Sequence, residues 1–331
     1  MNIDRTNQEQ EVLDDLLRAC LRGWGWRVRE AVPIKRGWMN LKWRIVTDEG
    51  DFLLKQYNRE RYKLYDPEAL SFAFEQQTRL HDAGLPCPRP LAHQDRVMLD
   101  SERGERFMVM PFCPGRLVPP GGASADQMYG LGRAAGLMHR LLNDGTNRKM
   151  AAGPQFRPPS REERLAHWDA VRGQAVAAGR EELLDDIDTQ RRATETIALT
   201  AFESLQTGWA HRDLWADNLL FDDSRVSAIL DFDRLKYDYP ALDIARAVLS
   251  LALGESLDAT LAEAFVMGYR EERALAAGEL SRALQMLWYL ESPWWITAEG
   301  SECGLPPERF AYEMNWLANN LGELRELVGG L

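Results

Sequence analysis

The sequence predicts an α+β protein of two lobes, a small lobe on an antiparallel sheet with one helix and a larger, mainly helical lobe. Strand-like runs dominate residues 26–112, whereas helical periods dominate the remainder. A Gly- and Pro-rich segment, residues 113–124 (CPGRLVPPGGAS), separates the two regions. The length of 331 residues is sufficient for two lobes around a cleft. We therefore expect one lobe over residues 1–112 and a second over residues 113–331.

The small lobe begins with apolar positions at helical spacing over residues 8–22, which predict a leading helix. Three strands are expected next, WRVREAVPI, WMNLKWRIVT and DFLLKQY, and the turn DEGD makes a hairpin of the last two. A helix over residues 66–82 follows, with Asp66 as its N-cap and Pro67 in its first turn. Two strand-like runs, PLAHQDRVML and ERFMVMPF, complete a β-β-β-α-β-β order.

The second lobe is predicted to be helical apart from one stretch. Helices are expected over residues 126–142, 160–179, 181–205, 241–254, 257–275, 279–290 and 307–328. The exception is residues 211–233 (HRDLWADNLLFDDSRVSAILDFD), which we expect in loops and short strands. Because polar residues gather in this stretch at fixed intervals, it is the first place to look for chemistry.

Composition and charge exclude several classes of function. The net charge of −11 argues against a nucleic-acid surface, which needs a basic face. The cysteines at positions 20, 87, 113 and 303 form no C-x-x-C pair, so a zinc site is not expected. The polar start MNIDRTNQEQ is not a signal pattern, and no apolar run reaches membrane-spanning length. We expect a cytoplasmic protein with reduced thiols and no membrane partner.

Residues 211–233 carry a spacing that indicates phosphoryl transfer. Asn218 follows Asp213 by five residues, and Asp231 follows the apolar run VSAIL, which reproduces H-R-D-x-x-x-x-N followed by D-F-[GD]. Such chemistry needs a carboxylate to accept the proton of the attacking hydroxyl, which predicts Asp213 as the base. Asn218 and Asp231 offer an amide and a carboxylate oxygen to Mg²⁺. Each residue alone is more typical of a hydrogen-bonded turn, and only the joint spacing favours catalysis.

The small lobe contains two residues that a kinase of this kind requires. Lys55, at the end of the apolar strand DFLLKQY, is predicted to bind the phosphates of ATP. Glu75, in the following helix (FAFEQQTRL), is predicted to orient that lysine. A solubilising lysine on an edge strand and a solvated helix face are the alternatives. The order of the two residues and their elements favours the nucleotide interpretation.

The remaining nucleotide contacts are less specific. The segment KRGWMN contains a single glycine, Gly37, and the chain has no G-K-[ST], which excludes a P-loop NTPase. Asn40 is expected either to touch phosphate or to cap the turn. FMVMPFCPG is expected to pass the adenine ring, with backbone groups of Met110 and Phe112 bonded to its edge. A buried strand with methionine as filler explains part of the same segment.

These motifs resemble the aminoglycoside phosphotransferase / choline kinase superfamily, and within it the spore-coat (CotS-like) or homoserine-kinase-like branch. The resemblance runs from WMNLKWRIV through GLPCPRP to HRDLWADNLLF and ILDFDRLKYDYPALDIAR, and is most specific in the last two. It implies a bilobal protein-kinase-like fold that uses ATP and Mg²⁺. It also implies that Asp213 is the catalytic base, that Asn218 and Asp231 bind the metal, and that Lys55 with Glu75 positions ATP.

The resemblance assigns structural or accessory roles to His211, Asp233 and Asp243. Asp243, in LDIAR, is expected to brace the catalytic loop through buried hydrogen bonds, and Asp233 to assist metal or substrate. The chain departs from the family pattern at Arg212, which stands where the family commonly has Gly. Since the segment after Asp231 is too short for an activation loop, we expect Arg212 to form a structural ion pair. Trp215 also departs, and either narrows the acceptor pocket or packs.

The acceptor is predicted to be a small molecule with a hydroxyl group, such as an amino alcohol, an amino acid, a sugar or an aminoglycoside-like compound. Trp and Tyr are frequent in residues 288–296 and 310–320, where their rings with Glu291 or Glu313 are one candidate ammonium site. Aromatic packing between amphipathic helices is the favoured alternative. A bacterial stress-type protein Ser/Thr kinase and a non-catalytic coat-like protein are the rival functions. The predicted nucleotide and catalytic residues argue against the latter.

Overall fold

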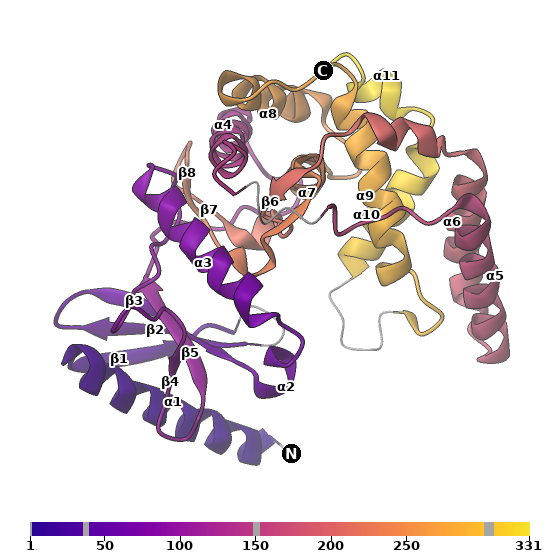
Figure 1. Ribbon diagram of the computed structural model, residues 1–331. Coiled ribbons are helices and arrows are strands. Elements are labelled where there is room, and N and C mark those ends of the chain that lie inside the picture. Colours follow the sequence, from indigo (N-terminus) through magenta and orange to yellow (C-terminus); the bar gives the residue numbers. More distant parts are fainter. Residues whose placement is uncertain (1, 36–39, 148–152, 301–307) are drawn as a thin grey trace. The chain divides into compact units, whose positions relative to one another are not determined.

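The chain separates into two compact units (Figure 1). The computed structural model describes residues 2–35, 40–147, 153–300 and 308–331. The first unit comprises Met1–Gly115 and Ser227–Arg234, and the second comprises Arg116–Val226 and Leu235–Leu331. The segment that carries Asp231 and Asp233 thus belongs to the first unit, although it comes late in the sequence. Gly37 lies outside the described residues.

The first unit is built on a five-stranded antiparallel sheet of order β1-β2-β3-β5-β4. Its strands are β1 Val28–Pro33, β2 Leu41–Thr47, β3 Asp51–Tyr57, β4 Leu99–Asp100 and β5 Arg106–Pro111. The strand predicted over PLAHQDRVML is wrong except at the end of that segment, where β4 begins. Gln94 and Asp95 adopt positive φ angles of 51° and 63°, and the tight turn they form interrupts the extended backbone.

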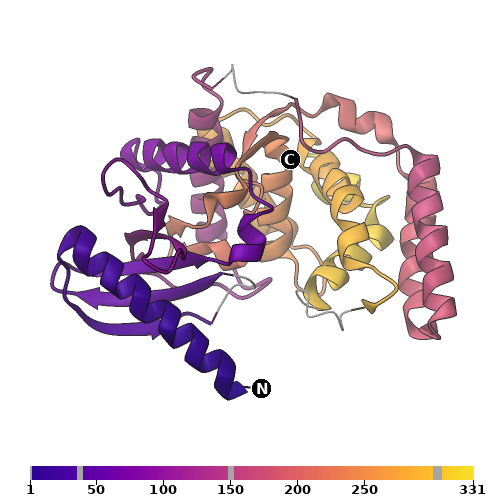
Figure 2. The ribbon, with the colours of Figure 1, turned by 60° about the horizontal axis from the view of Figure 1, so that its bottom comes forward.

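Helices cover the two faces of this sheet. α1 Asn2–Trp24 lies along one face (Figure 2) and packs Leu16 and Cys20 against Trp43, Ile45 and Leu54. α3 Pro67–Asp82 belongs to the other face, with the short α2 Arg59–Tyr62 before it. Asp66 caps α3 as expected, since its side chain accepts from the N–H of Glu68 at 3.0 Å. The strand residues that face away from α1 include Lys55 and Tyr57.

The second unit is mainly helical, and the α+β class is confirmed. Its helices are α4 Ala125–Leu142, α5 Arg161–Ala177, α6 Leu184–Thr196, α7 Pro240–Ala252, α8 Ala259–Glu272, α9 Glu279–Trp295, α10 Glu308–Asn320 and α11 Leu324–Val328. Short strands β6 Gly208–Ala210, β7 Leu219–Phe221, β8 Val226–Ile229 and β9 Lys236–Asp238 lie in the motif region, with β8 at the border between the units. The continuous helix expected over residues 181–205 is wrong. Ile197 is extended (φ −67°, ψ 138°) and buried, which ends α6 and separates it from the 3₁₀ turn Leu199–Ser204.

α7 is the central helix of the second unit, and all its residues are buried. It packs against α4, α8 and α9, and it carries Asp243 and Arg246 one turn apart. α4 and α8 lie side by side (Figure 1) in close backbone contact, because a Cβ on Gly132 or Gly268 would collide with the carbonyl groups of Phe265 or Tyr129. In the described part of the chain, no helix combines the length and apolar character needed to cross a membrane.

Candidate active site

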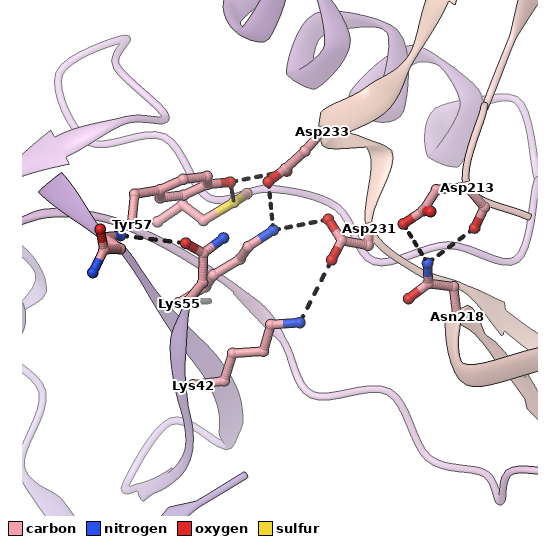
Figure 3. Close-up of polar contacts among 10 residues, drawn as sticks. Lys42, Lys55, Tyr57, Asp213, Asn218, Asp231 and Asp233 are labelled. Carbon is pink, nitrogen blue, oxygen red and sulfur yellow. Dashed lines mark hydrogen bonds and ion pairs between the residues drawn. The ribbon is translucent and has the colours of Figure 1, made fainter. Parts of the chain in front are cut away.

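The HRD motif occupies a loop between β6 and the 3₁₀ turn Ala216–Asn218. The Asn218 side-chain amide donates through Nδ2 to the backbone oxygen of Asp213 and to its Oδ2, both at 2.9 Å (Figure 3). These two hydrogen bonds to one residue fix the orientation of the amide group, so that its oxygen remains available to another ligand. Asp213 itself is only half-buried, so its carboxylate is held by Asn218 but not enclosed.

Asp243 anchors the backbone of this loop from α7. Its two oxygens accept the N–H groups of His211 at 2.6 Å and Arg212 at 2.7 Å. Burial alone would raise the pKa of Asp243, but the hydrogen bond that it accepts from His139, with the positive charge near the loop, holds this pKa below its ordinary value. An ionised buried carboxylate that accepts backbone N–H groups is a rigid support for the HRD loop.

His139 on α4 extends this support, and the sequence reasoning missed it. Its Nε2 lies 3.0 Å from Oδ2 of Asp243, and its Nδ1 lies 2.9 Å from the hydroxyl of Tyr269. Burial lowers the pKa of His139, so the neutral ring donates to Asp243 and accepts from Tyr269. A single histidine in an apolar helix carried no signal of this role, because its partners come from distant elements.

Arg212 forms the structural ion pair that was expected. Its Nε lies 2.8 Å from Oδ2 of Asp238, a fully buried carboxylate on β9. The N–H does not point at that oxygen, so the contact is an ion pair and not a linear hydrogen bond. Arg212 adopts a φ of +65°, a conformation that glycine reaches more readily.

A second set of charged residues lies in the first unit, around Lys55 on β3. Lys55 Nζ donates to Asp231 Oδ1 at 2.9 Å and to Asp233 Oδ2 at 2.7 Å (Figure 3). The hydroxyl of Tyr57 donates to Asp233 Oδ1 at 2.9 Å, and Lys42 on β2 lies 3.5 Å from Asp231 Oδ2. Burial alone would lower the pKa of Lys55, but the charges of Asp231 and Asp233 keep it well above its ordinary value.

The expected pairing of Lys55 with Glu75 does not occur in this structure. Glu75 is exposed on α3, where its contact is the hydroxyl of Ser71 at 3.5 Å. The buried face of α3 instead presents apolar and amide side chains, Phe72 and Gln76 among them. The carboxylate that holds Lys55, together with Asp231, is Asp233. The sequence order of Lys55 and a helix glutamate did not specify which way the helix faces.

The predicted adenine contacts are also revised by the strand register. Phe112 donates its N–H to the carbonyl of Asp51 at 2.9 Å, and Met110 is paired with Leu53. Because hydrogen-bonded pairs alternate along an antiparallel ladder, both predicted residues direct their backbone groups into the sheet. By the same alternation, the carbonyl of Pro111 is directed away from β3, and the thiol of Cys113 lies 3.9 Å from it. Asn40, the remaining predicted residue, accepts the N–H of Asn58, which directly follows β3, at 3.3 Å, so neither phosphate binding nor capping of its own turn is tested.

The predicted aromatic region of the second unit is a packed cluster. The ring of Phe310 lies between two indoles, with its centroid 5.1 Å from that of Trp215 and 4.6 Å from that of Trp295. Trp215 therefore packs against an aromatic ring, which is one of the two roles expected for it. Beneath Phe310, Arg246 donates to Glu291 at 3.2 Å and to Glu313 at 2.7 Å. Burial alone would lower the pKa of Arg246, but these two carboxylates, with a smaller contribution from Asp213, raise it.

The two glutamates differ in how many of their carboxylate oxygens accept hydrogen bonds. Both oxygens of Glu313 are bonded, one to Arg246 and the other to Arg309 at 2.9 Å. In the described part of the chain, Glu291 is bonded through Oε2 alone, to Arg246 and to the indole N–H of Trp295, both at 3.2 Å. Both glutamates are thus paired with Arg246, and among the described residues Oε1 of Glu291 accepts no hydrogen bond. Arg246 was missed in the sequence, although it follows Asp243 by one helical turn.

The oxygens available for a metal are those that Mg²⁺ or a similar hard cation prefers. The amide oxygen of Asn218 is left by the orientation of its NH₂ group, and Asp231 is a partly exposed carboxylate. Across the described residues, no cluster of three or more His, Cys, Asp or Glu side chains is arranged as a metal cage. Each of these oxygens, taken by itself, is thus a possible ligand of a cation that keeps water and phosphate ligands.

Sequence comparisons connect this geometry to known proteins. A family model described as the phosphotransferase enzyme family matches residues 30–280. A homoserine kinase of Acidiphilium cryptum is 32% identical over 282 residues, which cover 84% of this chain and 82% of the relative. A homoserine kinase of Gluconacetobacter diazotrophicus is 30% identical over 257 residues, 77% of this chain and 75% of the relative.

Solved structures of low sequence identity share the fold. The amicoumacin kinase hAmiN in complex with AMP-PNP, Ca²⁺ and Ami matches with a TM-score of 0.61 at 15% identity, over 97% of this chain and 96% of that one. Spectinomycin phosphotransferase APH(9)-Ia in complex with ADP and spectinomycin matches with a TM-score of 0.61 at 14% identity, over 96% and 98%. At these identities the likeness concerns the fold.

Proposed function

This chain belongs to the phosphotransferase enzyme family, and on that premise we propose that it transfers the γ-phosphate of Mg·ATP to the hydroxyl of a small amino acid or amino alcohol. The enzyme class, a kinase with an alcohol group as acceptor, follows from the family and the homoserine kinase relatives. The choice of Mg²⁺ as the metal and the identity of the acceptor are proposals. Homoserine is the first acceptor to test.

The observation that carries the proposal is the support of the HRD loop by Asp243. Two backbone N–H groups of the loop end on this one buried carboxylate, while Asn218 holds the carboxylate of Asp213. Asp213 then accepts the proton of the acceptor hydroxyl as that oxygen attacks phosphorus. Phosphoryl transfer needs little covalent chemistry from the protein, so a fixed base is its main requirement on this side.

The nucleotide side of the proposal rests on the charged residues around Lys55. Lys55 binds phosphate oxygens of ATP, and Asp233 holds the lysine in position through the 2.7 Å contact. Asp231 and Asn218 each supply an oxygen to Mg²⁺, which when bound neutralises charge on the phosphates. The carbonyl of Pro111 and the N–H of Cys113 are the proposed partners of the adenine edge, in place of Met110 and Phe112.

The acceptor class rests on the surroundings of Asp213 and on the relatives. Glu291 keeps one oxygen beside the indole of Trp295, an arrangement suited to an ammonium group. Asp213 contributes to the raised pKa of Arg246, and Arg246 donates to Glu291 at 3.2 Å, so the proposed base and the proposed ammonium ligand are near the same arginine. The homoserine kinases to which this chain is similar are named for an acceptor with both groups.

A panel of matched acceptors tests this function. Initial rates of ADP formation with Mg·ATP are measured for homoserine, 3-aminopropan-1-ol, which lacks the carboxylate, and 4-hydroxybutyrate, which lacks the ammonium. Serine, choline, kanamycin and casein complete the panel. We expect the highest kcat/KM among the acceptors that carry an ammonium group. Turnover of 4-hydroxybutyrate equal to that of homoserine would contradict the proposed role of Glu291, and turnover of casein alone would identify a protein kinase instead.

A further inference from the structure

The hairpin β2–β3 places two lysines directly opposite each other. Lys42 on β2 is the register partner of Lys55 on β3, so both side chains extend from the same face of the sheet (Figure 3). Like charges in this arrangement repel each other unless carboxylates lie between them. Here Asp231 accepts from both, through Oδ1 to Lys55 and Oδ2 to Lys42. Each oxygen of the proposed metal ligand is therefore held by an ammonium group.

The two lysines are held very differently. Lys55 is 3% exposed and bonded to two carboxylates, at 2.9 Å and 2.7 Å. Lys42 is 19% exposed, and within the described ranges of the chain its ion pair is with Asp231 alone, at 3.5 Å. Oδ2 of Asp231 can thus be released from Lys42 without breaking the buried contacts of Lys55. The flexible four-carbon stem of lysine allows its ammonium group to exchange between neighbouring anions.

We propose that Lys42 is a second phosphate-binding lysine: it pairs with Asp231 in this structure and moves to a phosphate oxygen of ATP when Asp231 takes up the metal. This inference rests on the proposed function. It assigns a task that the sequence otherwise leaves open, because the segment KRGWMN contains one glycine where kinases commonly use a Gly-rich loop over the phosphates. A lysine supplies the same positive charge as a point donor.

The alternative role for Lys42 is neutralisation of Asp231 only. The two roles predict different changes in Mg·ATP affinity when the lysine is removed. If Lys42 binds phosphate, its removal weakens Mg·ATP binding. If Lys42 only competes with the metal for Asp231, its removal strengthens Mg·ATP binding or leaves it unchanged. Equilibrium binding measures this change directly. It needs no acceptor and is independent of the chemical step.

The experiment is a calorimetric titration of Mg·ATP, Mg·ADP and adenosine into wild-type protein and three variants. Lys42→Met removes the charge, Lys42→Arg retains it, and Lys63→Met applies the same change to an exposed lysine of the same unit. We expect Lys42→Met to raise the Kd for Mg·ATP by about tenfold or more. Adenosine binding should not change, Lys42→Arg should lose less, and Lys63→Met should match wild type.

The binding results distinguish the two roles of Lys42. Tighter or unchanged Mg·ATP binding by Lys42→Met would overturn the inference, as would an equal loss for adenosine. If Lys42→Met fails to fold, Lys42→Arg must still weaken Mg·ATP binding relative to adenosine for the inference to stand. A wild-type protein that binds Mg·ATP but phosphorylates no acceptor would contradict the proposed function alone. A wild-type protein that binds no nucleotide would overturn both.

Discussion

Replacing Asp233 by Asn removes one charge of the buried cluster around Lys55 and leaves the side-chain volume almost unchanged. Asp233 is 6% exposed, with Lys55 Nζ at 2.7 Å and the hydroxyl of Tyr57 at 2.9 Å. Removal of one partner from a buried ion pair costs roughly 3–5 kcal/mol. Asp231 remains 2.9 Å from the same ammonium, so the expected loss in the free energy of unfolding lies at the lower end, about 3 kcal/mol.

Urea unfolding followed by tryptophan fluorescence measures this loss, and a double-mutant cycle identifies its origin. Lys55→Met should also destabilise the protein, because it leaves two carboxylates facing each other. The double variant, with both charges removed, should lose less than the sum of the single losses by about 1–3 kcal/mol. The matched control is Asp82→Asn, which removes a half-exposed partner of Arg89. Additive losses in the cycle, or a loss no larger than that of Asp82→Asn, would contradict a stabilising ion pair between Asp233 and Lys55.

Three further predictions concern the second unit. Asp243→Ala should lower kcat by about a hundredfold through misplacement of the catalytic loop, with the Kd of Mg·ATP retained in titrations; unchanged kcat would contradict the bracing role. The pKa of His139 is lowered in the folded protein, so its contribution to the free energy of unfolding should be lost as pH falls below about 6.5. Urea unfolding at several pH values measures this loss, and the free energy of unfolding of His139→Gln should lack this dependence on pH. Gly132→Ala should destabilise the protein by about 1–3 kcal/mol, because the new Cβ would meet the carbonyl of Phe265; the control Gly173→Ala, on an open helix surface, should stabilise it slightly in the same unfolding measurement.

The sequence predicted what depends on local spacing. The separation of Asp213, Asn218 and Asp231 indicated phosphoryl transfer, and the family comparison confirms that reaction class. The hairpin DEGD and the cap Asp66 were equally local, and the structure has both. The roles of the individual site residues stay predictions, because no ligand contact tests them.

What failed depended on contacts between distant segments. Glu75 was assigned from its order in the chain, but the side of α3 that faces the sheet is set by packing of Leu70 and Phe74. Tyr57 and Asp233 were not paired in advance, because they are separated by 176 residues. Periodicity also could not locate the break at Ile197, where a buried apolar side chain ends a helix without glycine or proline.

The most direct test of the account is the rate of phosphate transfer to homoserine by wild type and by Asp213→Asn. Phosphorus NMR detects the phosphomonoester, and calorimetry of Mg·ATP binding accompanies both proteins. We predict product with wild type, a rate at least a hundredfold lower with Asp213→Asn, and equal Kd values for Mg·ATP. Equal rates in the two proteins, or a loss of rate matched by an equal loss of Mg·ATP affinity, would contradict the assignment of Asp213 as the base.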